Sequence, residues 1–253
     1  MCFDNDSHPP IAPITGAASD HHRSTLTASD GNEFAVYEAF SEGEAQTGVV
    51  VLPDVRGLYH FYEELAVRLA EAGHDAIAID YFGRTAGTGD RGDAFPYQDH
   101  VPQVTDAGLT ADVGAALARL RRGNPDRAVF TMGFCFGGSS SWQQAAHGHG
   151  LAGAIGFYGR PDGRRPEGAR TPIELAPEMA APILGLMGGA DPGIPAETVA
   201  LFEKALVAGG VEHEIVTYEG APHSFFDRKY DEYADESADA WRRVLEFIRV
   251  HTD

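Results

Sequence analysis

A cysteine near the middle of the chain has neighbours that suit a nucleophile. Cys135 lies in the segment 133–138 (GFCFGG), between a short apolar run and a stretch that is expected to be helical. A nucleophile on a tight strand-to-helix turn needs small residues two positions away on either side, and glycines supply them here. The N–H groups at the start of the following helix would stabilise a thiolate. The pattern therefore favours a catalytic thiol over a buried structural cysteine.

Two further residues could complete a hydrolytic triad with Cys135. A nucleophile needs a general base, and an acid must orient that base. Asp191 follows an apolar run in the sequence GGADP, and His223 follows another in the sequence EGAPH. The chain order of nucleophile, acid and histidine is one known for such triads. Asp191 alone could be a turn residue and His223 alone a surface histidine, so the prediction depends on the three together.

These residues need a scaffold that brings the ends of several strands together. Apolar runs predict buried strands, and apolar residues at helical spacing predict helices between them. The predicted strands are 48–53, 76–80, 127–134, 153–159, 182–189 and 213–220, and the predicted helices are 59–72, 113–120, 137–148, 195–208 and 233–250. Strands that alternate with helices form a mostly parallel sheet with helices on both faces. Ligands bind beyond the carboxyl ends of such strands, where Cys135, Asp191 and His223 all fall.

The remaining segments set the limits of the domain. The sequences STLTAS and EFAVYEAF flank Asp-Gly-Asn at 30–32, which predicts a β-hairpin at one edge of the sheet. We predict a polar N-terminal tail over residues 1–24 and one domain over residues 25–253, with about eight strands in its sheet. Residues 83–108 are rich in Gly, Asp, Pro and Thr, which is typical of a lid or binding loop.

Charge and hydropathy exclude several classes of partner. The chain has 38 acidic and 19 basic residues, a formal charge of −19. This argues against nucleic acid and against an anionic membrane surface as partners. No run of about 20 apolar residues predicts a membrane span, and the first residues do not resemble a secretory signal. The expected location is the cytoplasm. Arginine outnumbers lysine, which a high-GC genome or salt adaptation would each explain.

The other candidate metal and redox features are weak. The tracts at 21–22 and 147–149 contain two histidines each but lack a third ligand at suitable spacing, so no metal is expected. Glycine-rich stretches lack the strand and helix context of a dinucleotide site, so no cofactor is expected. The two cysteines, Cys2 and Cys135, are expected to be reduced thiols in a cytosolic protein.

The motifs resemble those of the dienelactone hydrolase (carboxymethylenebutenolidase-like) family of the α/β-hydrolase fold. The resemblance covers roughly residues 25–250 and rests on the segments 133–138, 187–191 (MGGAD) and 220–225 (GAPHSF). A cysteine, rather than a serine, in the turn is the family's distinctive mark. The resemblance implies the α/β-hydrolase fold and a triad of Cys135, Asp191 and His223. It also implies an oxyanion hole formed by the backbone N–H groups of Val55 and Phe136.

Further family features map onto this sequence residue by residue. The family has a glutamate just after the third strand that holds the resting thiol, and the matching residue is Asp54, one methylene shorter. Asp54 could instead cap the helix that begins near residue 59. The family binds a substrate carboxylate with arginines, and Arg84 matches one of them. The position of the second holds Asp227, followed by Arg228. Arg56 is a third candidate, suggested by this sequence alone.

The resemblance implies a monomeric enzyme that needs no cofactor and opens a small lactone or ester through a thioester acyl-enzyme. The substrate class most implied is the carboxymethylenebutenolides, or dienelactones, formed during the breakdown of chlorocatechols and related aromatic compounds. One alternative is a general carboxylesterase or thioesterase on the same fold. Another is a non-catalytic protein that senses oxidants or binds ligands through Cys135.

Overall fold

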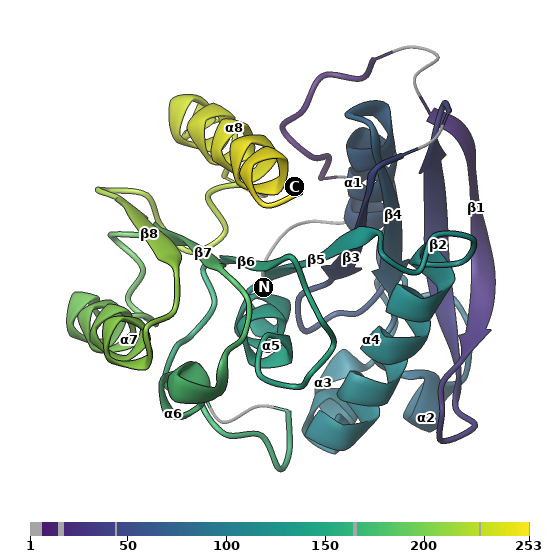
Figure 1. The fold of residues 1–253 in the computed structure, drawn as a ribbon, viewed down its shortest axis with the longest axis horizontal. Helices are drawn as coiled ribbons and strands as arrows, with labels where there is room; N and C mark the ends of the chain where they lie inside the picture. Colours follow the sequence, from purple (N-terminus) through teal and green to yellow (C-terminus); the bar gives the residue numbers. More distant parts are fainter. Residues whose placement is uncertain (1–6, 15–17, 44, 164–165, 228, 253) are drawn as a thin grey trace.

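One mixed sheet organises the chain. This computed structural model describes residues 7–14, 18–43, 45–163, 166–227 and 229–252. The strand order is β1-β2-β4-β3-β5-β6-β7-β8 (Figure 1). The strands are β1 (Ala18–Thr27), β2 (Glu33–Ser41), β3 (Thr47–Leu52), β4 (His74–Ile79), β5 (Ala128–Phe134), β6 (Gly153–Phe157), β7 (Ile183–Gly188) and β8 (His213–Tyr218). The predicted α/β fold is confirmed, and the sheet has eight strands.

The antiparallel strands lie at one edge of this sheet. β1 and β2 form the predicted hairpin, with Leu26 opposite Phe34. β2 also runs antiparallel to β4, and the neighbouring pairs from β4 to β8 are parallel. β1 begins at Ala18, so it includes residues that were predicted to belong to the tail. The difference arises because an edge strand pairs through its backbone, while polar residues such as His21 and His22 interrupt the apolar pattern.

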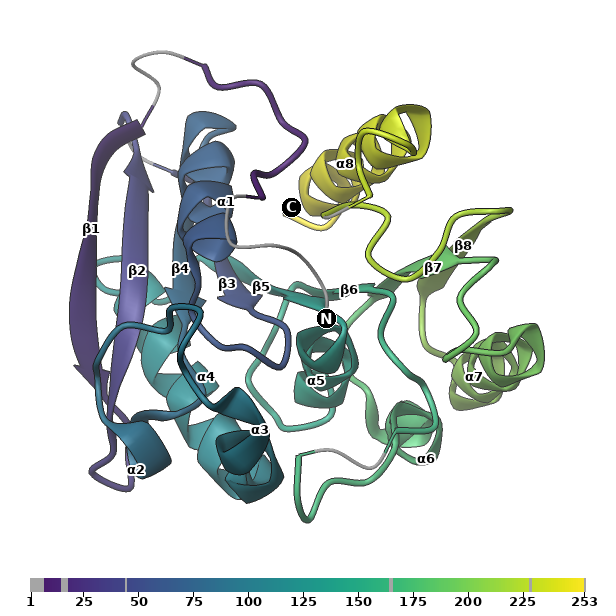
Figure 2. The same ribbon diagram turned by 180° about the vertical axis from the view of Figure 1, so that it is seen from behind.

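Helices cover both faces of the sheet (Figure 1, Figure 2). α1 (His60–Glu71) and α8 (Ala234–Val250) lie on one face, and α4 (Asp106–Leu120), α5 (Phe136–Gln144) and α7 (Ala196–Gly209) lie on the other. Alternate residues of β3 pack in opposite directions. Val49 and Val51 belong to the core cluster that contains α1, whereas Val50 and Leu52 belong to the cluster around α4. Burial on both faces explains why the parallel strands are continuous apolar runs.

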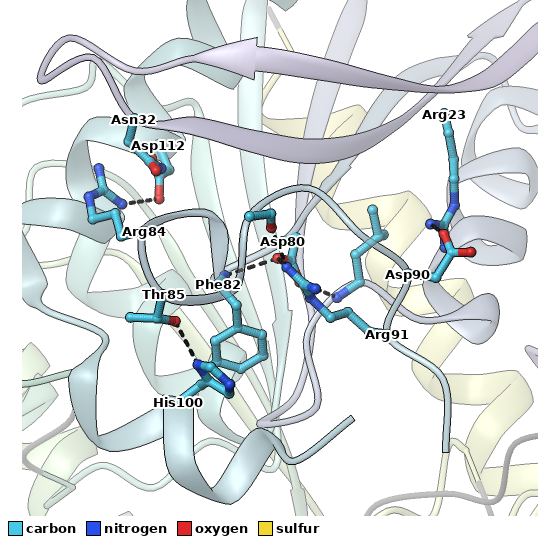
Figure 3. Close-up of polar contacts among 12 residues, drawn as sticks. Arg23, Asn32, Asp80, Phe82, Arg84, Thr85, Asp90, Arg91, His100 and Asp112 are labelled. Atoms are coloured by element: carbon cyan, nitrogen blue, oxygen red, sulfur yellow. Dashed lines mark hydrogen bonds and ion pairs between the residues drawn. The ribbon is translucent and has the colours of Figure 1, made fainter. Parts of the chain in front are cut away.

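Short helices occupy several of the loops. The segment 83–108 contains α2 (Gly83–Ala86), α3 (Tyr97–His100) and the 3-10 helix η1 (Val101–Gln103), and α6 (Pro172–Leu175) and η2 (Ala176–Glu178) precede β7. The buried guanidinium of Arg91 donates to the buried carboxylate of Asp80, and the Thr85 hydroxyl contacts His100 (Figure 3). The Arg91–Asp80 pair anchors the segment to the end of β4, and the Thr85–His100 contact joins α2 to α3 within it.

Two residues named above, Cys2 and Arg228, lie outside the described residues, and the predictions for them stay predictions. Within the described ranges, no helix combines the length and the apolar character that crossing a bilayer requires.

Candidate active site

Cys135 occupies the turn between β5 and α5. Its backbone angles are φ 55° and ψ −111°, a conformation that is unfavourable for a residue with a side chain. The Cys135 N–H donates to the Phe157 carbonyl of β6 at 3.0 Å, and the Cys135 carbonyl accepts from the Gly138 N–H at 3.1 Å. Backbone hydrogen bonds on both sides therefore hold the strained residue, while its side chain stays partly exposed.

The glycines around Cys135 are required because backbone segments approach closely. A Cβ atom on Gly133 would lie 1.9 Å from the Gly137 carbonyl oxygen. A Cβ atom on Gly137 would lie 2.1 Å from the Leu52 carbonyl oxygen of β3. Neither distance leaves room for a carbon atom beside backbone, so any larger residue would force the turn away from β3. The glycine pattern in the sequence therefore reflects the packing that presents Cys135.

Asp191 and His223 meet beyond the ends of β7 and β8. His223 Nδ1 lies 2.5 Å from Asp191 Oδ2, and the Gly193 N–H donates to Asp191 Oδ1 at 2.8 Å. Burial raises the pKa of Asp191, but the hydrogen bonds from His223 and Gly193 outweigh that effect and hold the pKa below its usual value. The carboxylate therefore stays ionised near neutral pH and can orient the imidazole. The structure thus brings together two residues that are 32 positions apart in the chain.

A cavity of about 630 Å³ adjoins Cys135 and His223. Val55 and Phe136, the residues assigned to the oxyanion hole by the family resemblance, also line it. Asp191 lies behind His223, with only 2% of its side chain exposed. The volume suits a small-molecule ligand. The other residues that line the cavity are Ser139, Tyr158, Arg160, Asp162, Gly163, Gly193 and Ile194.

Tyr158 forms the wall beside His223. The centroids of the two rings are 4.9 Å apart, and the Tyr158 hydroxyl donates to Asp227 Oδ2 at 2.7 Å. Both Tyr158 and Asp227 are buried, and Tyr158 has a positive φ of 36°. The position at which the family resemblance would place an arginine thus holds a carboxylate that anchors Tyr158. This contact fixes the ring against which the His223 imidazole packs.

Asp54 is buried where β3 ends. Its Oδ1 accepts from the Arg56 N–H at 2.8 Å, which closes a local turn. The interpretation of Asp54 as a helix cap is wrong, because α1 begins at His60 and its N-cap residue is Tyr59. The physical reason is that the Asp54 carboxylate accepts its hydrogen bond from the Arg56 N–H, which lies in the loop before α1 begins.

Asp54 and Cys135 both act on the hydroxyl of Tyr81. Tyr81 donates to the Pro53 carbonyl at 2.5 Å. Burial raises the pKa of Tyr81 well above its usual value, and the charges of Asp54, Asp80 and Cys135 raise it further. Tyr81 is therefore a neutral hydrogen-bond donor that braces the loop carrying Asp54.

Two of the predicted carboxylate-binding arginines do not line this cavity. Arg84 donates to Asp112 at 2.6 Å (Figure 3) and to Asp30 at 2.7 Å. Arg56 lies over the ring of Tyr59, 4.7 Å from its centroid, and lines a separate pocket of about 70 Å³. The buried Asp112 carboxylate requires an opposite charge, and Arg84 supplies it. The Arg84 guanidinium is therefore directed at Asp112 and not at the cavity.

Arg160 is the arginine that lines the cavity within the described residues, and it is not among the predicted site residues. The backbone N–H of Arg160 donates to Ser139 Oγ at 2.7 Å, and the Ser139 hydroxyl donates to the backbone carbonyl of Arg160 at 3.0 Å. Its guanidinium donates to Asp162 at 2.7 Å, and 59% of its side chain is exposed. The sequence signal that points to Arg160 is its place just after β6, a parallel strand that ends at the same edge as β5.

Known proteins resemble this chain over most of its length. Residues 34–252 match the model of the "Dienelactone hydrolase family". The chain is 31% identical over 245 residues to a "Putative carboxymethylenebutenolidase" from Yersinia pestis, covering 91% of this chain and 89% of the relative. It is 30% identical over 208 residues to a "Probable 2-oxo-3-(5-oxofuran-2-ylidene)propanoate lactonase" from a Bradyrhizobium species, covering 80% of this chain and 83% of the relative.

A solved structure supports the same relationship. The crystal structure described as a "Putative Dienelactone Hydrolase" from Klebsiella pneumoniae superposes with a TM-score of 0.78 at 28% identity, covering 91% of this chain and 99% of that chain. The predicted family and the predicted enzyme class are both confirmed. The chain is a hydrolase that acts on esters, and it belongs to the dienelactone hydrolase family.

Proposed function

We propose that this enzyme opens small lactones of the dienelactone type through a triad of Cys135, His223 and Asp191. The observation that carries the proposal is the short contact between His223 Nδ1 and Asp191 Oδ2, at a cavity that Cys135 also lines. This is the arrangement that nucleophilic catalysis requires, with a nucleophile and a base at one ligand site and an acid behind the base.

In the first half of the reaction His223 takes the proton of the Cys135 thiol, and the resulting thiolate attacks the lactone carbonyl. A C–S bond forms, and the carbonyl oxygen becomes an oxyanion beside the backbone N–H groups of Val55 and Phe136. The ring C–O bond then breaks and leaves a thioester on Cys135. The ring oxygen leaves as an enolate or alkoxide and takes a proton from His223. A dienelactone suits a thiolate nucleophile because its enolate is a good leaving group.

In the second half, water releases the product. His223 takes a proton from a water molecule, which attacks the thioester carbonyl. The C–S bond breaks, the acid product forms, and the Cys135 sulfur takes the proton from His223 and returns to the resting thiol. Asp191 stays ionised throughout and stabilises the imidazolium that forms in each half. Asp54 is buried in the loop that follows β3. We assign it the role of holding the resting thiol, in place of the family's glutamate.

We assign recognition of a substrate carboxylate to Arg160. The names of the two relatives described above each combine a carboxylic acid with an unsaturated lactone ring. A guanidinium binds a carboxylate through two parallel hydrogen bonds. Arg160 already donates in this way to Asp162 Oδ1 and Oδ2, at 2.7 and 3.3 Å. A substrate carboxylate would replace Asp162 as the partner of Arg160 at the cavity wall.

The direct test compares hydrolysis of a dienelactone with hydrolysis of a p-nitrophenyl ester by the same purified protein. Cys135→Ala serves as the blank for both substrates. We expect kcat/KM to be at least about tenfold higher for the dienelactone, a difference of about 1.4 kcal/mol in transition-state binding. A higher value for the simple ester would favour the general carboxylesterase or thioesterase. No turnover of either substrate above the blank would reject catalysis and favour a role in sensing or binding.

A further inference from the structure

One group of three metal-ligating side chains lies outside the cavity. Across the described ranges, His8, His60 and Glu64 are the set whose potential ligand atoms all lie within 4.8 Å of one another. His8 Nδ1 is 2.6 Å from Glu64 Oε2, and His60 Nε2 is 3.1 Å from Glu64 Oε1. None of the three residues lines the cavity beside Cys135. The group is therefore separate from the candidate active site.

Two elements far apart in the sequence supply this group. His60 and Glu64 lie one turn apart at the start of α1, so their side chains share a face of the helix. His8 belongs to the N-terminal segment 7–14, which lies along α1 (Figure 2). The Ile14 N–H of this segment donates to Glu71 Oε2 at 3.1 Å, near the other end of α1. The segment therefore already contacts the helix at both ends.

The ligand types and spacing suit Zn²⁺. Two imidazoles and one carboxylate form a ligand set that zinc sites use, with water in the fourth position. Zinc–ligand bonds of about 2.0–2.2 Å place neighbouring ligand atoms roughly 3.5 Å apart in a tetrahedron. The separations of 2.6 and 3.1 Å run to the two different oxygens of Glu64, and one ligand atom from each residue lies within 4.8 Å of the others, so side-chain rotation would bring the three atoms to that spacing. All three side chains are at least partly exposed, so an ion can reach them from solvent.

A second carboxylate lies near the other ring nitrogen of His60. The Nδ1 atom of His60, which faces away from Glu64, lies 4.0 Å from Glu63 Oε2. Glu63 is itself paired with Arg23 from β1. Metal-binding histidines commonly direct their second nitrogen at a carboxylate, which sets the tautomer that leaves the other nitrogen free for the metal. Glu63 would have to approach Nδ1 from its present 4.0 Å to do this for coordination through Nε2.

We propose that His8, His60 and Glu64 bind one Zn²⁺ ion that fastens the N-terminal segment to α1. The role is structural, because the cavity and its cysteine lie elsewhere. The prediction that the chain binds no metal is revised for this surface alone. Sequence spacing could not reveal the group, since His8 is separated from Glu64 by 56 positions.

The test is a calorimetric titration of the untagged full-length protein with ZnCl₂. Cys2→Ser and Cys135→Ala are introduced first, so that neither thiol competes for the metal. We expect one zinc ion per chain in this background. His8→Ala and His60→Ala should each weaken binding by about 100-fold or more, whereas Glu63→Gln should weaken it by about 10-fold to 100-fold. His213→Ala, whose Nδ1 contacts the Val211 carbonyl, is the matched control and should leave binding unchanged.

Amide hydrogen exchange gives an independent readout of the same proposal. Zinc should slow exchange in the segment 7–14 of the background protein and should have no effect there in the His60→Ala variant. Absence of stoichiometric binding would overturn the proposal. Binding that survives both His8→Ala and His60→Ala would overturn it as well, because the ion would then occupy another site.

Discussion

Charged side chains gather in two neighbouring regions at the carboxyl edge of the sheet, and they are used differently. One region is the acid–arginine cluster, which we define as Asp80, Arg84, Arg91 and Asp112, labelled in Figure 3, together with Asp30, which accepts from Arg84. The other is the cavity, with Arg160, Asp162, Asp191 and His223 at its wall or directly behind it. Asp80, Arg84 and Arg91 follow β4, and the cavity residues follow β6, β7 and β8, so position after a parallel strand does not by itself distinguish the arginines of the two regions.

Burial distinguishes the two regions. Asp80, Arg91 and Asp112 are buried, and each has an opposite charge within hydrogen-bonding distance. Removing such charges from water is unfavourable unless they are paired, so these side chains cannot leave their partners to bind a ligand. Arg160 pairs with a single exposed aspartate, and exposed pairs are weak. An arginine at the sheet edge can therefore serve a ligand only where the fold does not already require its charge.

The largest effect should come from the cavity. His223→Ala removes the proposed general base while leaving the acid–arginine cluster untouched. We expect kcat/KM to fall by about 10³-fold or more, with the melting temperature close to that of the parent. Steady-state hydrolysis and thermal unfolding monitored by circular dichroism measure the two quantities. A large fall in the melting temperature of His223→Ala alongside the loss of activity would contradict the distinction between the two regions.

A substitution in the acid–arginine cluster should have the opposite outcome. Arg91→Leu leaves the buried Asp80 carboxylate without its ion-pair partner, and breaking a buried pair in this way costs about 3–5 kcal/mol of the free energy of unfolding. Urea denaturation measures the loss. Arg242→Leu, which removes a surface pair with Asp239, is the matched control and should cost about 1 kcal/mol or less. Activity of folded Arg91→Leu should stay near that of the parent.

Selectivity for charge should separate Arg160 from Arg84. We expect Arg160→Gln to lower kcat/KM for a carboxylated lactone by about tenfold, at the low end for a charged hydrogen bond because the guanidinium is exposed. The methyl ester of the same substrate should be almost unaffected. Arg84→Gln should leave the ratio of the two kcat/KM values unchanged and lower stability instead. If Arg84→Gln lowered the ratio of the two kcat/KM values and Arg160→Gln left it unchanged, Arg84 and not Arg160 would be the residue that recognises the carboxylate.

The pH dependence of that selectivity should be small. The hydrogen bond from Arg160 lowers the pKa of Asp162, so the pair is present above the usual carboxyl range and is lost only as the pH falls through the lowered pKa of Asp162. The guanidinium stays charged throughout. We therefore expect the ratio of kcat/KM for the carboxylated and methylated substrates to be constant from about pH 5 to pH 8. A ratio that declines as the pH rises through this window would indicate a histidine as the recognition group.

The contrast between the regions also explains what could be predicted from the sequence. The strands, the main helices and the motifs around Cys135, Asp191 and His223 depend on local signals such as apolar runs and glycine spacing. The placement of Arg84 depends on Asp30 and Asp112, which are 54 and 28 positions away. No local pattern carries that information, because the demand for a partner arises only once Asp112 is buried by folding.

The other differences have related causes. The start of β1 at Ala18 could not be predicted from an apolar pattern, because backbone pairing at a sheet edge tolerates polar side chains. The turn formed by Asp54 and the Arg56 N–H resembles a helix cap in sequence, since both use an aspartate just before a helix. Arg160 lies in a segment without a motif, and only its place after β6 connects it with the cavity. The catalytic roles of the triad stay predictions until they are tested.

The most direct test of the central proposal is to trap the acyl-enzyme. The protein is mixed with a p-nitrophenyl ester, quenched in acid within the first turnover, digested and analysed by mass spectrometry. We predict one acyl group per chain, located on the peptide that contains Cys135, with slower loss of this group in Asp191→Asn. Hydrolysis without any adduct on Cys135, or an adduct on another residue while Cys135→Ala stays active, would contradict the account.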